Sequence, residues 1–247
     1  HIQDPHKRPP GFARTAIGLP QFNLFAPKVI VAANQIGQPA EEVKITLYTA
    51  SGEFIAEKKL TELPTPNCVI DLGDVFMEER ESVDDVSVIF DFGFDSSPQP
   101  KPMEVFLHVY FQKDGRLLDQ SHTLRTVGYA AEIEPAKRSY RARKFAPIFI
   151  GGDRRSAFSI NNVGPYGNLP ETEFVLRFFL DNGLEEVHKV AVPANRCNLY
   201  WAEDFIAAGN DTLAGVVWIE HPSVNASAHW FIFDKHGGPA VDHFTGG

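Results

Sequence analysis

The sequence has few of the residues and motifs that mark common active sites. Among 247 residues there are two cysteines and two methionines, which is too few for a disulfide framework or a cysteine-rich zinc site. It contains no glycine-rich phosphate loop, no Gly-x-Ser-x-Gly motif and no His-Glu-x-x-His motif. No apolar run approaches the ~18 residues of a membrane-spanning helix. We therefore predict no membrane span and no organic cofactor site, and the sequence identifies no catalytic residue.

Positive charge is also scarce. The chain carries 23 Lys and Arg against 32 Asp and Glu, which gives a formal net charge of −9. Nucleic acids and anionic membranes bind to basic faces, so we predict neither partner. The basic run at residues 137–144 is interpreted as part of a linker. A hydrophobic fraction of 43% and a charged fraction of 22% are typical of a soluble globular protein with a substantial core.

Short strands are the main element that the remaining sequence predicts. Phenylalanine is frequent, with 20 residues, and Val, Ile and Thr accompany it, as is usual in sheets. Val43, Ile45 and Leu47 alternate with polar residues and so share one strand face. Similar segments recur every ~8–12 residues between Gly, Pro and Asn, the pattern of antiparallel sandwiches. The predicted strands cover residues 29–33, 43–48, 53–60, 68–72, 86–92, 105–112, 117–123, 158–161, 173–180, 187–192, 197–201, 215–220, 228–233 and 239–244, with helical turns at 75–80 and 202–208.

The two halves of the chain repeat one pattern. Each half has a turn glycine, a proline and a cysteine in the same order, namely Gly52, Pro64 and Cys68, then Gly183, Pro193 and Cys197. The fold prediction is therefore all-β, with two tandem antiparallel β-sandwich domains related by internal duplication. We expect both cysteines to be free and buried, one in the core of each half.

Composition also sets the predicted domain boundaries. Residues 1–21 are rich in proline, glycine and basic residues and are predicted to form an extended N-terminal arm. Residues 22–131 form the first sandwich, the charged segment 132–145 is the linker, and residues 146–247 form the second sandwich. Exposed edge strands favour pairing with other chains, so we expect a homo-oligomer. We expect a cytoplasmic location, and a secreted one if the chain's first residue is a mature N-terminus.

Each half also carries a pair of histidines at the same spacing. His122 follows His108 by 14 residues, and His243 follows His229 by 14 residues. A hairpin turn is predicted between the members of each pair. A one-residue bulge beside the first turn puts His108 directly opposite His122, and the second pair lies within one residue of direct opposition. Directly opposed residues have Cβ atoms ~4.5–5.5 Å apart, which suits two imidazoles that bind one Zn or Cu ion.

A transition metal needs further ligands, and the sequence offers several without a clear choice. The candidates are Asp119 and Glu104 for the first pair, and Asp242, Cys197, His221 and His236 for the second. Asp119 and Asp242 are displaced from equivalent positions, so no third ligand recurs cleanly in both halves. The alternative interpretation is that the histidines stack or hydrogen-bond across strands, and that their repetition reflects common ancestry alone.

Two segments are similar to a known family. The stretch Val192-Pro193-Ala194-Asn195-Arg196, followed by an aromatic strand and Glu203-Asp204-Phe205, resembles the "VPARR…FNDL" segment of the sensory rhodopsin transducer family. Residues 117–125 are similar to that family's "VVVQHTR" strand. Members of the family are small, single-repeat β-sandwich proteins that assemble as oligomers and bind partners. The resemblance therefore implies a tandem of two such sandwiches that associates with protein.

Two functions are consistent with these patterns. The leading hypothesis is a non-catalytic binding or assembly protein, whose partner is another protein or its own copies. It follows from the duplication, the family resemblance and the lack of a catalytic motif. The alternative is a metal-binding protein or metal-dependent enzyme that uses the cross-strand pairs His108–His122 and His229–His243. The identical spacing of the two pairs is the observation behind it.

Overall fold

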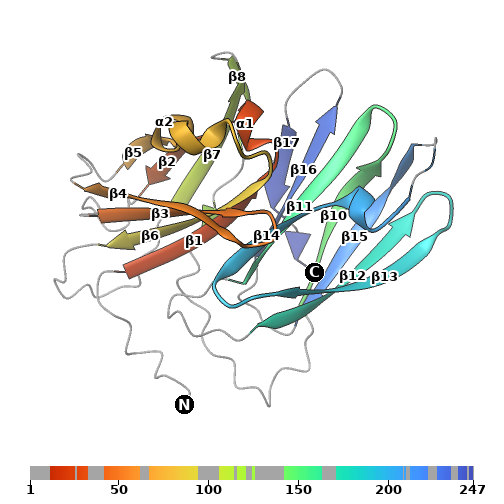
Figure 1. The fold of residues 1–247 in the computed structure, drawn as a ribbon. Coiled ribbons are helices and arrows are strands. Elements are labelled where there is room, and N and C mark those ends of the chain that lie inside the picture. The colour runs from red at the N-terminus through yellow and green to blue at the C-terminus, as the bar shows by residue number, and fades with distance from the viewer. Residues whose placement is uncertain are drawn as a thin grey trace, which may run out of the picture.

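The computed structural model consists almost entirely of antiparallel strands (Figure 1). Its few helices are single turns: α1 (Phe22–Phe25), α2 (Leu72–Val75), α3 (Met77–Arg80) and the 3₁₀ helix η2 (Ala202–Asp204). The structure describes residues 12–25, 27–32, 42–61, 67–93, 106–113, 116–120, 124–125, 142–162, 171–207, 209, 212–221, 227–234, 239–243 and 245–246. Within these ranges, none of the helices is long and apolar enough to cross a membrane.

The first half of the chain forms two sheets. Sheet A has the strand order β1-β6-β3-β4, and sheet B has the order β5-β2-β7-β8 with β9 also paired to β7. The strands are β1 (Phe12–Leu19), β2 (Lys28–Ala32), β3 (Glu42–Thr49), β4 (Phe54–Thr61), β5 (Asn67–Asp71), β6 (Val86–Gly93), β7 (Phe106–Lys113), β8 (Arg116–Gln120) and β9 (Leu124–Arg125).

The second half forms two further sheets. Sheet C has the order β13-β12-β15-β10-β18, and sheet D has the order β14-β11-β16-β17. The strands are β10 (Ala142–Ile150), β11 (Arg154–Asn162), β12 (Thr172–Leu180), β13 (Glu185–Val192), β14 (Arg196–Trp201), β15 (Leu213–His221), β16 (Ser227–Asp234), β17 (Pro239–His243) and β18 (Thr245–Gly246). Taken in chain order, β10 to β17 occupy the same places in sheets C and D as β1 to β8 occupy in sheets A and B. The predicted all-β, antiparallel architecture is confirmed.

Each half has an apolar core between its two sheets. On β12 the odd residues Val175, Arg177 and Phe179 are only partly buried, whereas the even residues are buried in the second core. This alternation follows from the two-residue period of a strand. The large buried side chains of the first core come from both sheets and the short helices, among them Ile17, Phe22, Val29, Phe76, Phe90 and Phe111. Full burial of one such side chain contributes roughly 1.5–3 kcal/mol.

Two strands begin within segments that the sequence analysis left without regular structure. Residues 12–19, assigned to the N-terminal arm, form β1, in which Ile17 and Leu19 point into the first core. Residues 142–145, assigned to the linker, open β10. Prolines and basic residues nearby obscure both strands in the sequence. The rest of the predicted linker, residues 132–141, lies outside the described ranges.

Sheet D joins the two halves, and Figure 1 shows it between the strands of the first half and sheet C. One face belongs to the second core, to which β11 contributes Phe158 and Ile160. The other face packs on the first half, where Ala157 of β11 and Phe231 of β16 join the first core. The ring of Phe231 lies 6.0 Å from that of Phe111 on β7. The halves are therefore joined by a buried, apolar contact.

Candidate functional site

The second predicted histidine pair has the strand register that its spacing indicated. His229 on β16 is directly opposite His243 on β17, and Ser159 of β11 is its neighbour on the other side. The His229 side chain is 5% exposed. It shares its side of β16 with Phe231 and Phe233, which pack on the first half. His229 therefore lies in the contact between the halves.

The first predicted pair is only partly within the described part of the chain. His108 lies on β7, opposite Ile30 of β2. The pairing of β7 with β8 shifts by one residue between Phe111 and Gln112. This is the bulge that direct opposition of the two histidines requires. His122 lies outside the described residues, so its pairing with His108 stays a prediction.

The further metal ligands considered above are spread over three sheets. Asp119 is on β8 of sheet B, His221 is on β15 of sheet C, and Asp242 and Cys197 are on β17 and β14 of sheet D. Glu104 and His236 lie outside the described residues. In the part of the chain that the structure describes, no group of three or more His, Cys, Asp or Glu side chains could hold a metal ion. The metal role of the histidine pairs stays a prediction.

Cys197 is fully buried beside Ser159, and burial raises the pKa of its thiol, which the hydrogen bond with Ser159 opposes. Both cysteines are free, as expected, and Cys68 packs against the core of its own half but is only partly buried. For Cys197 the expected position in the core of its own half is wrong, because it packs against three residues of the other half, Ala16, Tyr48 and Ile89.

Small residues allow the backbones of the two halves to approach closely. The Asn161 amide donates to the Ala16 carbonyl at 2.7 Å. A Cβ atom placed on Gly18 of β1 would lie 2.7 Å from the Cβ of Ser159. The Leu199 N–H donates to the Ala50 carbonyl at 3.0 Å. These contacts fix β11 and β14 against the edge strand β1 and the turn after β3.

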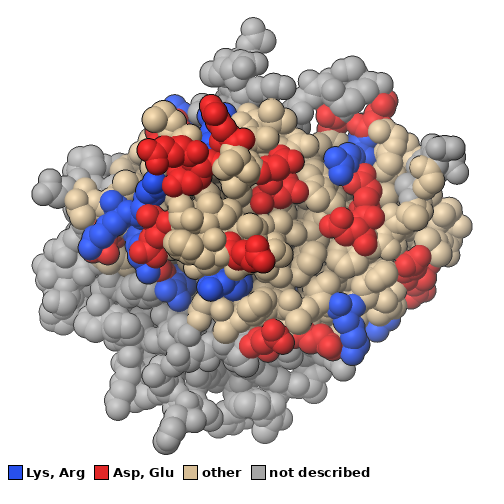
Figure 2. All heavy atoms as spheres, viewed as in Figure 1, with Lys and Arg blue, Asp and Glu red and all other residues tan. Residues whose placement is uncertain are grey.

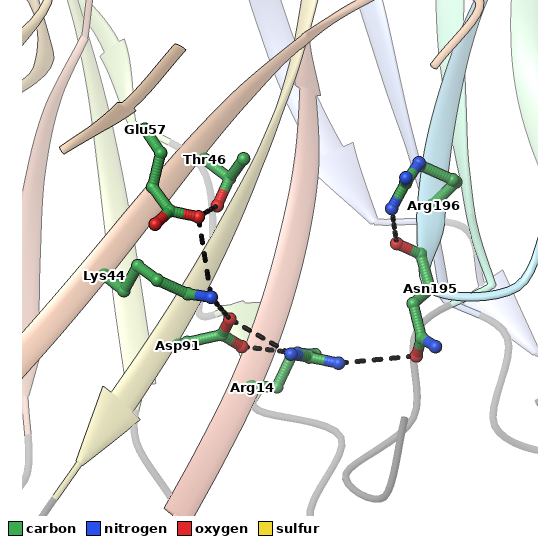
Figure 3. Close-up of polar contacts among 7 residues, drawn as sticks. All are labelled: Arg14, Lys44, Thr46, Glu57, Asp91, Asn195 and Arg196. Carbon is green, nitrogen blue, oxygen red and sulfur yellow. Dashed lines mark hydrogen bonds and ion pairs between the residues drawn. The ribbon is translucent and has the colours of Figure 1, made fainter. Parts of the chain in front are cut away.

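A buried ion pair lies beside this contact (Figure 3). Arg14 of β1 donates to both carboxylate oxygens of Asp91 on β6, with Nη2 3.0 Å from Oδ2. Lys44 Nζ approaches the same carboxylate at 3.6 Å. Arg14 also donates from Nη1 to the Asn195 side chain at 3.4 Å, which links the network to the second half. Asn195 has a φ of 56°, a left-handed conformation that Asn adopts more readily than most residues.

The family-like segment of the second half thus contributes to the junction. Asn195 bonds to Arg14, and the Arg196 guanidinium lies 4.3 Å from the centre of the Tyr48 ring. Asn195 lies in the connection from β13 to β14, and Arg196 is the first residue of β14. Within one chain, this segment therefore binds the first half.

A second polar cluster closes the junction at the other end of β14. Trp201 Nε1 donates to Asp85 Oδ2 at 2.5 Å. The Arg155 guanidinium lies 4.3 Å from the Trp201 ring and 2.8 Å from Glu203. Burial, and then the neighbouring Asp85, raise the pKa of Asp84. Figure 2 shows further Asp and Glu side chains in groups over this side of the molecule, including the region of α2 and α3.

The outer face of sheet C carries exposed apolar side chains together with an ion pair between Arg177 and Glu220 at 3.1 Å. Across the sheet, Phe145 is opposite Trp218, Trp218 is opposite Arg177, and Arg177 is opposite Val187. Phe145 and Val187 are 42% and 49% exposed. The rings of Trp218 and Phe179 lie 5.2 Å apart. Because the alternate residues fill the second core, these side chains form the opposite face.

The sequence analysis did not identify this face. Residues 145–150 are all apolar, so β10 shows no alternation of polar and apolar residues. A continuous apolar run can be a strand that is apolar on both faces. The run at residues 145–150 could therefore have indicated an apolar outer face. Trp218 lies on this face, opposite Phe145. Trp230 packs against the second core.

Comparisons with known proteins give only distant likenesses. No protein-family model matches the sequence, and no curated protein matches it. Among solved structures, the chain is similar to Bacteroides uniformis beta-glucuronidase at 7% identity and a TM-score of 0.19, covering 96% of this chain and 26% of that one. It is also similar to the serine-rich repeat protein Srr2 of Streptococcus agalactiae, at 14% identity and a TM-score of 0.21, covering 95% and 84%. A GH2 beta-galacturonidase from Eisenbergiella tayi has 8% identity and a TM-score of 0.18, covering 95% and 34%. Such likenesses carry no argument about function.

Proposed function

We propose that this chain is a non-catalytic assembly protein, built from two duplicated β-sandwich units, which binds protein surfaces and its own copies through outer sheet faces. The observation that carries the proposal is the outer face of sheet C, where Phe145 beside Trp218 is 42% exposed and Val187 beside Arg177 is 49% exposed. Contiguous apolar patches on a folded protein mark interaction sites.

The duplication is supported by the strand order and by one repeated register position, at which an arginine is opposite an acidic residue. Strands β10 to β17 are arranged as β1 to β8 are. Arg14 is opposite Asp91 on β1 and β6, and Arg143 is opposite Glu220 on β10 and β15. The resemblance to the sensory rhodopsin transducer family, whose members assemble as oligomers, agrees with the proposal.

The test is the mass of the full chain in solution over a series of concentrations, measured by light scattering after size exclusion. We expect the mass to rise with concentration. Val187→Glu on sheet C should weaken the association, because a charge then replaces apolar contact area. Met77→Glu is the matched control, since Met77 is 69% exposed but lies on α3. A chain that stays monomeric at every concentration contradicts the proposal.

A second function, binding of a transition metal, is favoured by one observation, the direct opposition of His229 and His243. Elemental analysis of the purified chain, repeated on His122→Ala and His243→Ala, tests it. A stoichiometric metal that is lost in one variant would establish the site and identify the half that holds it. Substoichiometric metal, or metal unchanged in both variants, would leave the histidines with a structural role.

A further inference from the structure

The contact between the halves has two different sides. The second half contributes the outer face of sheet D, including Ser159 and Leu199. The first half contributes the outer side of sheet A along β1 and β6, including Ala16 and Ile89. It also contributes part of its own core, where the Phe111 ring of β7 lies 6.0 Å from the Phe231 ring. Since the strand orders correspond, each side has a counterpart in the other half: sheet C corresponds to sheet A, and sheet B to sheet D.

The register locates the counterpart of the sheet A side. In both halves an arginine is opposite an acidic residue, Arg14 with Asp91 and Arg143 with Glu220. Two residues further along the first strand of each half, Ala16 corresponds to Phe145. Phe145 is 42% exposed, whereas Ala16 is buried under sheet D. The outer side of sheet A therefore has a partly exposed counterpart on sheet C. It differs in carrying the Arg177–Glu220 ion pair and in the pairing of β18 with Lys144 and Phe145 along the edge of β10.

The counterpart of the sheet D side is the outer face of sheet B. Ile70 and Val109 of this sheet fill the first core, so the alternate residues of the same strands face away from it. Val69 of β5 is one of them and is 61% exposed. On the same face Lys28 and Asp71 form an ion pair at 3.3 Å. Because the two charges cancel, this pair adds no net charge to the surface.

We infer that copies of this chain associate head to tail, with the outer face of sheet B of one copy on the outer face of sheet C of the next. The inference rests on the proposed assembly function and adds its surfaces and direction. Figure 1 shows β2 and β5 at one end of the molecule and β12 and β13 at the other, so both faces can be occupied at once. An interface between two different patches gives a ring or an open filament, unlike the closed dimer of a self-complementary patch.

The contact between copies differs from the internal contact in its spacing. Gly18 and Ser87 pair in the first half, where the second half has Pro147 and Val216. The larger side chains on sheet C hold an incoming sheet further away. They also supply more apolar area to bury.

Complementary variants of the full chain test the direction of assembly. Val69→Glu blocks sheet B and leaves sheet C intact, whereas Phe145→Glu blocks sheet C and leaves sheet B intact. In sedimentation velocity each variant alone should lose the concentration-dependent growth of the wild type. An equimolar mixture should form a dimer, because one unaltered contact remains between unlike variants. Met77→Glu should assemble like the wild type, and thermal unfolding of all variants checks that they are folded.

The alternative outcomes are distinct. If Phe145→Glu abolishes association and Val69→Glu does not, the copies pair through sheet C alone and the head-to-tail arrangement is refuted while the assembly function stands. The arrangement is also refuted if each variant is monomeric and their mixture forms no dimer. A wild type that is monomeric throughout would refute the assembly function itself. Val187→Glu repeats the sheet C test if Phe145→Glu does not fold.

Discussion

A single methyl group at Gly18 should weaken the contact between the halves. A Cβ at this position would lie 2.7 Å from the Ser159 Cβ and 3.1 Å from Leu199 Cδ1. Two carbon atoms are in favourable contact at ~3.5–4.0 Å, so the sheets must separate by almost an ångström or distort. Overpacking of this kind costs ~1–3 kcal/mol. For a chain of this length each kcal/mol lowers the Tm by roughly 2–4 °C, so Gly18→Ala should lower it by several degrees.

The measurement is urea or thermal unfolding, with two companion variants. Gly93→Ala is the control, because a Cβ there has its closest neighbour at 3.7 Å, and this variant should be neutral or stabilised by ~0.4–1 kcal/mol. Ser159→Gly removes the clashing atom, so it should recover part of the loss when combined with Gly18→Ala. Equal stabilities of Gly18→Ala and Gly93→Ala, or additive effects in the double variant, would refute the close approach of β1 and β11.

Three further predictions concern the charges and the buried thiol. Asp91→Asn should destabilise the chain by about 3 kcal/mol in urea unfolding. This is the low end for a broken buried pair, because the Arg14 side chain is still 18% exposed. An unchanged midpoint of unfolding would contradict the pairing. The raised pKa of Asp84 means that the folded state holds its proton more tightly than the unfolded state, so its contribution to stability falls as pH rises through the folded pKa. Asp84→Asn should therefore be more stable than the wild type at neutral pH, and this advantage should vanish below the ordinary Asp pKa of ~3.9; an equal advantage at all pH values would be inconsistent with a titration effect. In a Cys68→Ser variant, Cys197 should react with a thiol reagent at the rate of unfolding, because its side chain is fully buried; reaction at the rate of an unfolded control peptide would exclude this burial.

The individual strands could be predicted because the evidence for them is local. On β3 the residues that alternate in the sequence, Val43, Ile45 and Leu47, are all buried in the first core. The direct opposition of His229 and His243 followed from residue spacing across a hairpin. Both depend only on the two-residue period of a strand and on the length of a turn.

The contact between the halves could not be predicted in this way, since its partners are distant in sequence. On β11 the residues from Ser156 to Asn162 are all buried, although Ser159 and Asn161 are polar. Local reasoning assigns such polar residues to solvent, and only the contact with Ala16 and Gly18 of β1 explains their burial. Their role, which is to hold the two sheets together, could therefore not be predicted from the sequence.

The same contact bears on the meaning of the repeated histidines. His229 lies against the first half, and both faces of sheet D are buried, one in each core. Sheet B carries His108, and Val69 on the outer face of this sheet is 61% exposed. The two histidine pairs thus have identical spacing in the sequence but lie on sheets in different environments. The outer face of sheet D is covered by the first half of the same chain. A role common to both histidine pairs would have to depend on something that the two sheets share. The cross-strand register of the two hairpins is such a shared feature. Head-to-tail assembly would also cover the outer face of sheet B and make the two environments alike.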